Sequence, residues 1–250
     1  MKVILVNTLI PLYFIPDTSL LIRCGWGGRG CPLLTNVFYL YKIWTVSKNY
    51  SYLQYKYMKD DFILTLYSKP STAFSLKELS MLFPDISYNN MKSRVSYYAK
   101  RGKLKRIRKS MYAKHDYNPY ELATKIYTPS YLSLETVLEK EGIIFQDYTS
   151  IFVVSYTNRT LHIDGHTILL RRLEEDILLN KAGIIEKDNY FSATKERAFL
   201  DAIYLYKNYH FDNLRPLEWN KIMEIRYIYK NKTFEKRVES YYKLYRNEYV

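Results

Sequence analysis

Cysteine is nearly absent from this chain, because Cys24 and Cys31 are the only two among its 250 residues. Two thiols exclude a disulfide framework and a zinc site made of four cysteines, and they are typical of a reducing compartment. Long apolar runs are absent as well, since none reaches the roughly 18 residues that a membrane-spanning helix needs. We therefore expect a cytoplasmic protein that does not enter a membrane.

Common catalytic signatures are also missing, including the Walker phosphate loop, H-E-x-x-H and G-x-S-x-G. His162, Asp164 and His166 come closest to a set of metal ligands, but they flank a tight turn. The other histidines, His115 and His210, lie far away in sequence, and a stable site needs three or four converging ligands. We expect no enzyme activity, no cofactor and no bound metal.

A nucleic-acid-processing enzyme is the least favoured alternative. A nuclease needs separated carboxylates that converge with a lysine, and Lys195, Glu196 and Asp201 could be combined in that way. The acidic residues 174–176 cannot form a catalytic pair, because adjacent residues of a helix point in different directions. Charged helix faces and caps explain both stretches without any catalysis.

Acidic residues are scarce in the first half of the chain. Residues 1–57 hold six Lys/Arg and one acid, residues 58–115 hold thirteen and four, and residues 116–250 hold nineteen and twenty. Residues 100–114 alone carry eight Lys/Arg and no acid. A basic N-terminal part and a nearly neutral C-terminal part predict that one module binds a polyanion while the other has a different function.

The first 57 residues differ in composition from the rest. They open like a signal peptide, but Pro11 and Pro16 interrupt the apolar stretch and no typical cleavage site follows. Residues 23–32 then hold half of the eight glycines, without a helical or strand period. Our hypothesis is that Met58 is the natural start and that residues 1–57 are an upstream extension; a poorly packed N-terminal arm is the alternative.

Apolar spacing predicts three helices between residues 60 and 102. The first helix lies in DDFILTLYSK, and the second begins at a capping box formed by Ser75 and Glu78 and ends before Pro84. The third begins after the N-cap Ser87 and ends at Gly102. The buried stripe of the second helix is predicted to be Leu76, Leu79, Leu82 and Phe83.

The third helix has an acid-free polar face. Met91, Val95 and Tyr98 fall at i, i+4 and i+7, which makes them its buried side. Amides and hydroxyls on the opposite side suit the edges of bases, whereas cations suit phosphates. The candidates for base contacts are Asn89, Asn90, Ser93 and Ser96, and Lys92 is a candidate for a phosphate contact.

A basic β-hairpin is predicted directly after Gly102, in KLKRI and MYAK. Three helices followed by a two-stranded hairpin are the order of a winged helix-turn-helix, whose recognition helix enters the major groove of DNA. We therefore expect residues 58–115 to bind double-stranded DNA. The hairpin residues expected to hold phosphates are Lys105, Arg106, Arg108 and Lys109.

Residues 116–250 are predicted to form a mixed α/β C-terminal domain, so that the whole chain is of the α+β class. Helices are expected at 119–126 and 130–142, followed by a buried strand at 150–156. Asp164-Gly165 between two alternating runs predicts a tight hairpin. Two helical blocks, 192–208 and 217–247, complete the domain, and most of the 28 tyrosines are expected to pack in cores and interfaces.

The order of FSLKEL, LKRIRKSMYA, PYELATKIYTPSYLSLETVLEKEGI and FSATKERAFLDAIYLY resembles the AbiEi family of antitoxins from bacterial abortive-infection systems. The resemblance extends from about residue 60 to about residue 245. Its most specific pieces are residues 129–135 and residues 193–198, neither of which is a catalytic motif.

This resemblance implies a particular function. An N-terminal winged helix would repress the protein's own operon, and the C-terminal domain would counteract a nucleotidyltransferase-like toxin encoded beside it. Ser110 departs from the glycine usual at the turn of the wing, and residues 1–57 have no counterpart. A stand-alone transcription regulator without a toxin is the main alternative.

Overall fold

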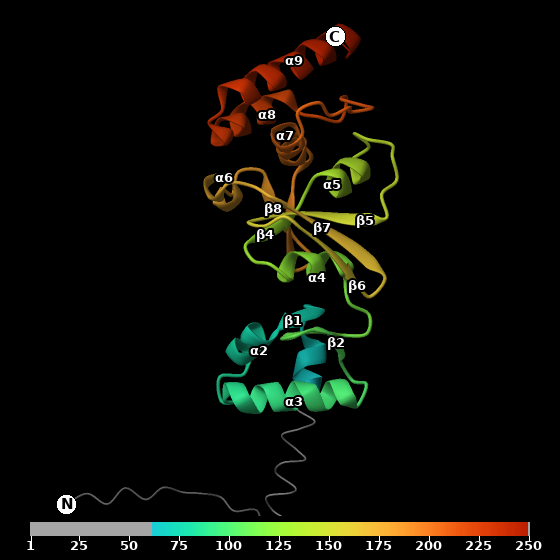
Figure 1. Cartoon of the computed structure of the whole chain (residues 1–250), viewed down its shortest axis with the longest axis vertical. Helices are drawn as coiled ribbons and strands as arrows, with labels where there is room; N and C mark the ends of the chain where they lie inside the picture. The colour runs from blue at the N-terminus through green and yellow to red at the C-terminus, as the bar shows by residue number, and fades with distance from the viewer. Residues whose placement is uncertain (1–61, 250) are drawn as a thin grey trace, which may run out of the picture. The chain divides into compact units, whose positions relative to one another are not determined.

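The computed structural model describes residues 62–249 (Figure 1). Residues 1–57, which our hypothesis treats as an upstream extension, and the suggested start at Met58 lie outside the described residues. Helices and strands are mixed along the described chain, and the strands form two separate sheets. The fold is therefore of the mixed α and β kind that the sequence predicts.

The first sheet is small and antiparallel, with the strand order β1-β3-β2. Residues 62–68 are helical. The elements that follow are β1 (Ala73–Ser75), α2 (Leu76–Leu82), α3 (Tyr88–Lys100), β2 (Lys105–Arg108) and β3 (Met111–Ala113). Strand β1, which the sequence did not predict, pairs with β3 and so joins the hairpin to the start of α2.

Local capping signals explain where the helices of this part begin. Ser75 accepts a hydrogen bond from the Glu78 amide at 3.1 Å, and the Glu78 carboxylate accepts one from the Ser75 amide at 2.6 Å. Ser87 caps α3, and Gly102 follows its end with a φ of +66°. One prediction is wrong: Leu82 is exposed, because α2 ends at this residue and the chain turns away.

The two faces of the small sheet pack against different helices. Phe74 and Tyr112 point to the side of α2 and α3, where they join a cluster that includes Met91 and Val95. The intervening strand residues Ala73, Met111 and Ala113 pack on the other side against Leu122. That leucine belongs to α4 (Pro119–Lys125), so α3 and α4 lie on opposite faces of the sheet (Figure 1).

The second sheet has six strands in the order β6-β7-β5-β4-β9-β8. Its strands are β4 (Ser130–Leu132), β5 (Ser150–Ser155), β6 (Arg159–Ile163), β7 (His166–Arg172), β8 (Ile184–Lys187) and β9 (Tyr190–Ala193). The β5–β7 and β4–β9 pairs are parallel and the remaining pairs are antiparallel. Helix α4 covers one face of this sheet, and α5 and α7 lie on the other (Figure 1).

The remaining helices complete the large core. They are α5 (Glu135–Lys140), α6 (Glu175–Leu179), α7 (Lys195–Leu205), α8 (Trp219–Ile225), the 3₁₀ helix η1 (Arg226–Tyr229) and α9 (Lys232–Tyr249). The helical block expected over 217–247 consists of α8, η1 and α9. Lys230 adopts a left-handed conformation with a φ of +46°, and the Asn231 side chain accepts hydrogen bonds from the first amides of α9.

Residues 130–142 do not form the single helix that their spacing predicts. Ser130–Leu132 is the strand β4, held between β5 and β9, and α5 starts only at Glu135. Leu134, with a φ of +57°, makes the turn between them. Tyr131 and Leu134 are nevertheless buried, which agrees with a packing role for this stretch.

Candidate nucleic-acid interface

The outward face of α3 carries the side chains predicted to contact bases. Asn89, Asn90 and Ser93 are exposed, and Ser96 is half-buried. Their position follows from the helical period, since Met91, Val95 and Tyr98 occupy the buried side. Lys92 is exposed on the outer side, and no carboxylate of the described residues pairs with it. The helix thus keeps these five polar side chains together on one surface.

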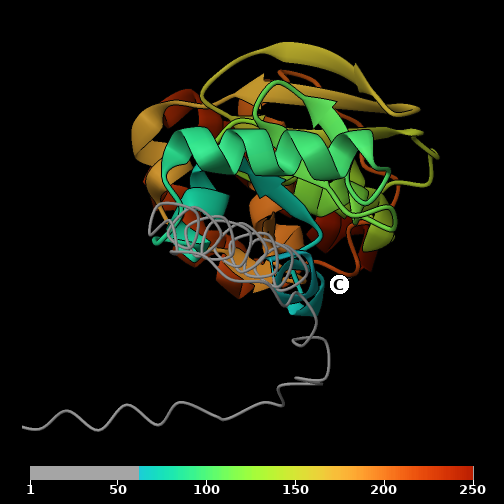
Figure 2. The same ribbon diagram turned by 90° about the horizontal axis from the view of Figure 1, so that it is seen from below.

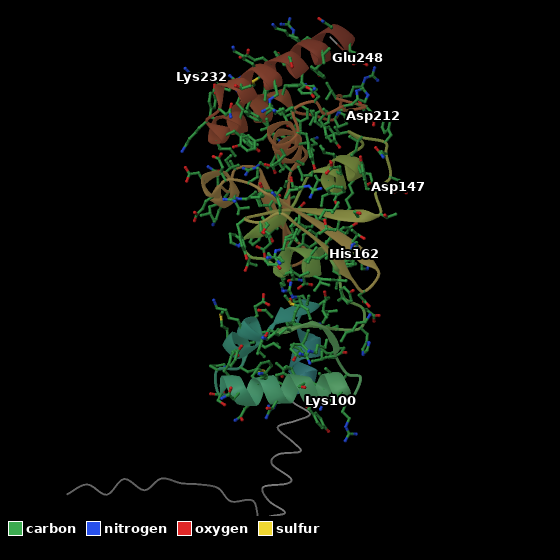
Figure 3. All side chains as sticks on the ribbon, in the orientation of Figure 1. Lys100, Asp147, His162, Asp212, Lys232 and Glu248 are labelled. Carbon is green, nitrogen blue, oxygen red and sulfur yellow. The ribbon has the colours of Figure 1, made fainter. Side chains whose placement is uncertain are left out.

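More cations follow at the end of α3. Lys100, labelled in Figure 3, is exposed in its last turn. Arg101 lies over the ring of Tyr97 at 5.3 Å, and Arg94, in the middle of α3, lies over Phe62 at 5.6 Å. Such contacts hold a guanidinium in place without neutralising its charge.

The four hairpin cations are divided between the two faces of the small sheet. Arg106 is paired with Tyr112, so it lies on the face of α3 and is exposed. Lys105 is paired with Ala113, and its side chain lies on the face of α4. A register shift between Arg106 and Arg108 returns Arg108 to that second face. The alternation of the strand therefore separates cations that are neighbours in sequence.

Lys105 is already paired with a carboxylate of the same chain, at the surface. Its Nζ lies 2.5 Å from a carboxylate oxygen of Asp164, in the β6–β7 turn, and the hydroxyl of Tyr117 donates to the same oxygen at 2.6 Å. The hydrogen bonds from Lys105 and Tyr117 hold the pKa of Asp164 below its usual range. Burial, together with the bond to Asp164, raises the pKa of Tyr117. Lys105 is thus less available for a phosphate than its sequence suggests.

Arg106 and Lys109 keep their charge uncompensated, because they are exposed and pair with no carboxylate in the part of the chain that the structure describes. Arg108 lies over the ring of Tyr127 at 5.4 Å. Lys114, the last cation of the basic run, is buried, and its ammonium donates to the carbonyls of Tyr67 and Lys69. Burial lowers the pKa of Lys114.

The two most specific sequence blocks meet in a buried polar network. Arg197, from residues 193–198, donates to the Tyr131 hydroxyl at 3.0 Å and to the Asp201 carboxylate at 3.2 Å. Asp201 also accepts from Ser133 at 2.8 Å and from Tyr229 at 2.7 Å. Buried hydrogen bonds thus join the two blocks, and the i, i+4 spacing of Arg197 and Asp201 is a sequence signal of the network.

The residues considered for a nuclease do not form an open site. Asp201 is completely buried and its carboxylate is held by Arg197. Glu196 is buried as well, with Lys195 3.9 Å from its carboxylate. Across residues 62–249, no group of three or more His, Cys, Asp or Glu side chains could hold a metal ion. His162, on β6 (Figure 3), contacts Thr167 at 3.2 Å.

A cavity of about 240 Å³ lies beside the start of α7, and charged side chains form much of its lining. Two of its lysines are paired with Glu218: Lys221 lies 2.8 Å from this carboxylate, and Lys195 lies 3.8 Å from it. Four lysines and three glutamates line the cavity, so its formal charge is close to zero.

Comparisons with known proteins add no identity. A scan against protein-family models and a search of curated proteins both return no match to this chain. Within residues 62–249, none of the helices is both long enough and apolar enough to cross a membrane.

Proposed function

We propose that this protein is an antitoxin and autorepressor, with a winged helix-turn-helix over residues 58–115 that binds operator DNA. The observation that carries the proposal is the acid-free outer face of α3 beside an exposed, unpaired Arg106. Amides and hydroxyls on a helix can contact base edges in the major groove. A cation on the adjacent strand can bind the phosphates that flank the groove.

The order of elements supports the same proposal. The helix at residues 62–68, α2 and α3 precede a two-stranded hairpin, which is the arrangement of winged-helix DNA-binding modules. The predicted base contacts are Asn89, Asn90, Ser93 and Ser96, and the predicted phosphate contacts are Lys92, Arg106, Arg108 and Lys109. Lys105 is the weakest of the phosphate candidates because Asp164 already binds it.

The toxin-directed role of residues 116–250 rests on the resemblance to the AbiEi family. Its test is genetic: a nucleotidyltransferase-like reading frame beside the gene should stop growth when expressed alone and should be tolerated when this protein is co-expressed. Absence of such a reading frame would favour the stand-alone regulator.

DNA binding is tested with the full chain and a labelled duplex from directly upstream of its gene. Fluorescence anisotropy should show binding that prefers this duplex over an unrelated one and that weakens steeply with salt. Weak binding that is indifferent to sequence and salt would refute the proposal.

The arrangement of the hairpin predicts a difference between two neighbouring cations. Arg106→Gln should reduce the slope of log K against log salt by about one, because one phosphate contact is lost. Lys105→Gln should change that slope much less, because Lys105 is already paired with Asp164. Equal effects of the two substitutions would contradict the assignment of Arg106 to the binding face.

A further inference from the structure

The edge strands of the two sheets lie side by side. Strand β2 is an edge of the small sheet and β6 is an edge of the large one. Lys105 of β2 contacts Asp164 just beyond β6, and Ile107 and Ile163 pack around the same apolar cluster. Figure 2 shows the golden β6–β7 hairpin extending past α3 on one side, where α3 does not cover it.

Two arginines from these neighbouring strands share one tyrosine. Arg108, at the end of β2, lies 5.4 Å from the centre of the Tyr127 ring, and Arg159, at the start of β6, lies 5.7 Å from it. Both arginines are exposed. The Tyr156 ring packs edge-on against the Tyr127 ring, with 6.1 Å between the ring centres. The pKa of the Tyr127 hydroxyl is lowered, mainly by Arg108 and also by Arg159, because both guanidinium groups lie close to it.

The charge of this cluster is not compensated. No carboxylate of residues 62–249 lies within ion-pair distance of Arg108 or Arg159. Lys105 on the same strand differs from Arg108, because Asp164 forms an ion pair with Lys105. Two guanidinium groups around one hydroxyl repel each other until an anion joins them, and a phosphate suits their planar donor geometry.

We propose that the DNA-binding surface continues from the β2–β3 hairpin onto β6, where Arg159 and Arg108 together bind a backbone phosphate. Tyr127 holds the two guanidiniums in position. This inference rests on the proposed function, because the phosphate belongs to the same duplex that α3 contacts. It assigns Arg159, a residue of the C-terminal part, to DNA binding, which the basic run at 100–114 does not predict.

The test compares Arg159→Gln with Arg246→Gln in the full chain, using the upstream duplex and an unrelated duplex of equal length. Arg246 is an exposed arginine of α9, so its substitution removes the same net charge from another surface. Arg159→Gln should lower the salt slope by about one and weaken both complexes roughly five- to tenfold near 0.1 M salt. Arg159→Lys should keep most of the slope, since it keeps the charge.

Each outcome has a separate meaning. If the wild type binds with a steep slope while Arg159→Gln behaves like Arg246→Gln, the extension onto β6 is wrong and the proposed function stands. If the wild type does not bind either duplex, the proposed function fails and the extension fails with it. Thermal unfolding of Arg159→Gln at the wild-type temperature would show that any loss of binding is not a loss of fold.

Discussion

At the scale of single residues, the buried guanidinium of Arg197 constrains the fold. It has no exposed surface, and its donors reach Asp201, the hydroxyl of Tyr131 and the carbonyls of Ile177 and Ala182. The proximity of Asp201 raises the pKa of Arg197 even though burial opposes it. A buried charge of this kind is tolerable only because every donor has a partner.

Arg197→Lys should therefore destabilise the protein by about 2–4 kcal/mol although it keeps the charge. Lysine has three donors on a single nitrogen and cannot reach the carboxylate, the hydroxyl and two carbonyls at once. Urea unfolding at neutral pH measures the effect. Arg172→Lys, at an exposed position of β7, is the matched control and should stay within about 0.5 kcal/mol of the wild type. A similar small change at Arg197 would mean that the network contributes little.

At the scale of elements, the sequence predicts well those helices that carry local signals. The capping box at Ser75, the N-cap at Ser87 and the left-handed Gly102 lie where the pattern puts them. The Asp164-Gly165 turn likewise joins β6 and β7. Each of these signals acts within a few residues of chain, so no knowledge of the tertiary structure is required.

The elements that escape prediction are short strands whose partners are distant in sequence. Ser130–Leu132 becomes β4 because β5 and β9 flank it, and β1 exists because β3 offers it an open edge. The candidate site shows the same limit. Lys105 and Arg108 look alike in sequence, but Asp164 neutralises the first, whereas Arg159 accompanies the second at Tyr127. Only the packing of β6 against the hairpin makes them different.

Gly183, where the chain enters β8, gives a prediction at this scale. It has a φ of +72°, and a Cβ there would lie 2.8 Å from the Cβ of Arg197 and 3.0 Å from Ile225. Gly183→Ala should combine backbone strain with overpacking and cost roughly 2–4 kcal/mol. Gly165→Ala has a similar φ of +84° but open space around its Cβ, so only the strain, about 1 kcal/mol, should remain. Equal losses in urea unfolding would show that α7 can move aside.

At the scale of the whole described chain, Glu121 joins the small sheet to α4. Its carboxylate is 1% exposed and accepts hydrogen bonds from Ser71, from the amide of Thr72 at 2.8 Å and from Lys125 at 2.8 Å. Lys125 in turn donates to the carbonyl of Ala73 at 2.9 Å. The chain entering β1 is thus tied to α4 by charged hydrogen bonds, next to the apolar cluster around Leu122.

Protonation of Glu121 should loosen this junction in acid. Burial alone would raise the pKa of Glu121, but hydrogen bonds from Lys125, Ser71 and Thr72 outweigh it and lower the pKa below 4.5. A lowered pKa in the folded state means that the carboxylate's contribution to stability is complete above about pH 4.5. That contribution is lost as the pH falls through the folded value.

Glu121→Gln should therefore reduce the free energy of unfolding by about 1.5–3 kcal/mol at pH 7, and this difference from the wild type should shrink below pH 4.5. Urea unfolding at several pH values measures it, with Glu248→Gln, at an exposed position of α9, as the control for one lost carboxylate.

Hydrogen exchange should show where the stability is lost. If Glu121 joins the small sheet to α4, the amides of α3 should lose protection before those of α7 in the variant, whereas both should open together in the wild type. A difference that stays constant with pH, or a loss of protection confined to α4, would mean that the carboxylate acts only within its own helix.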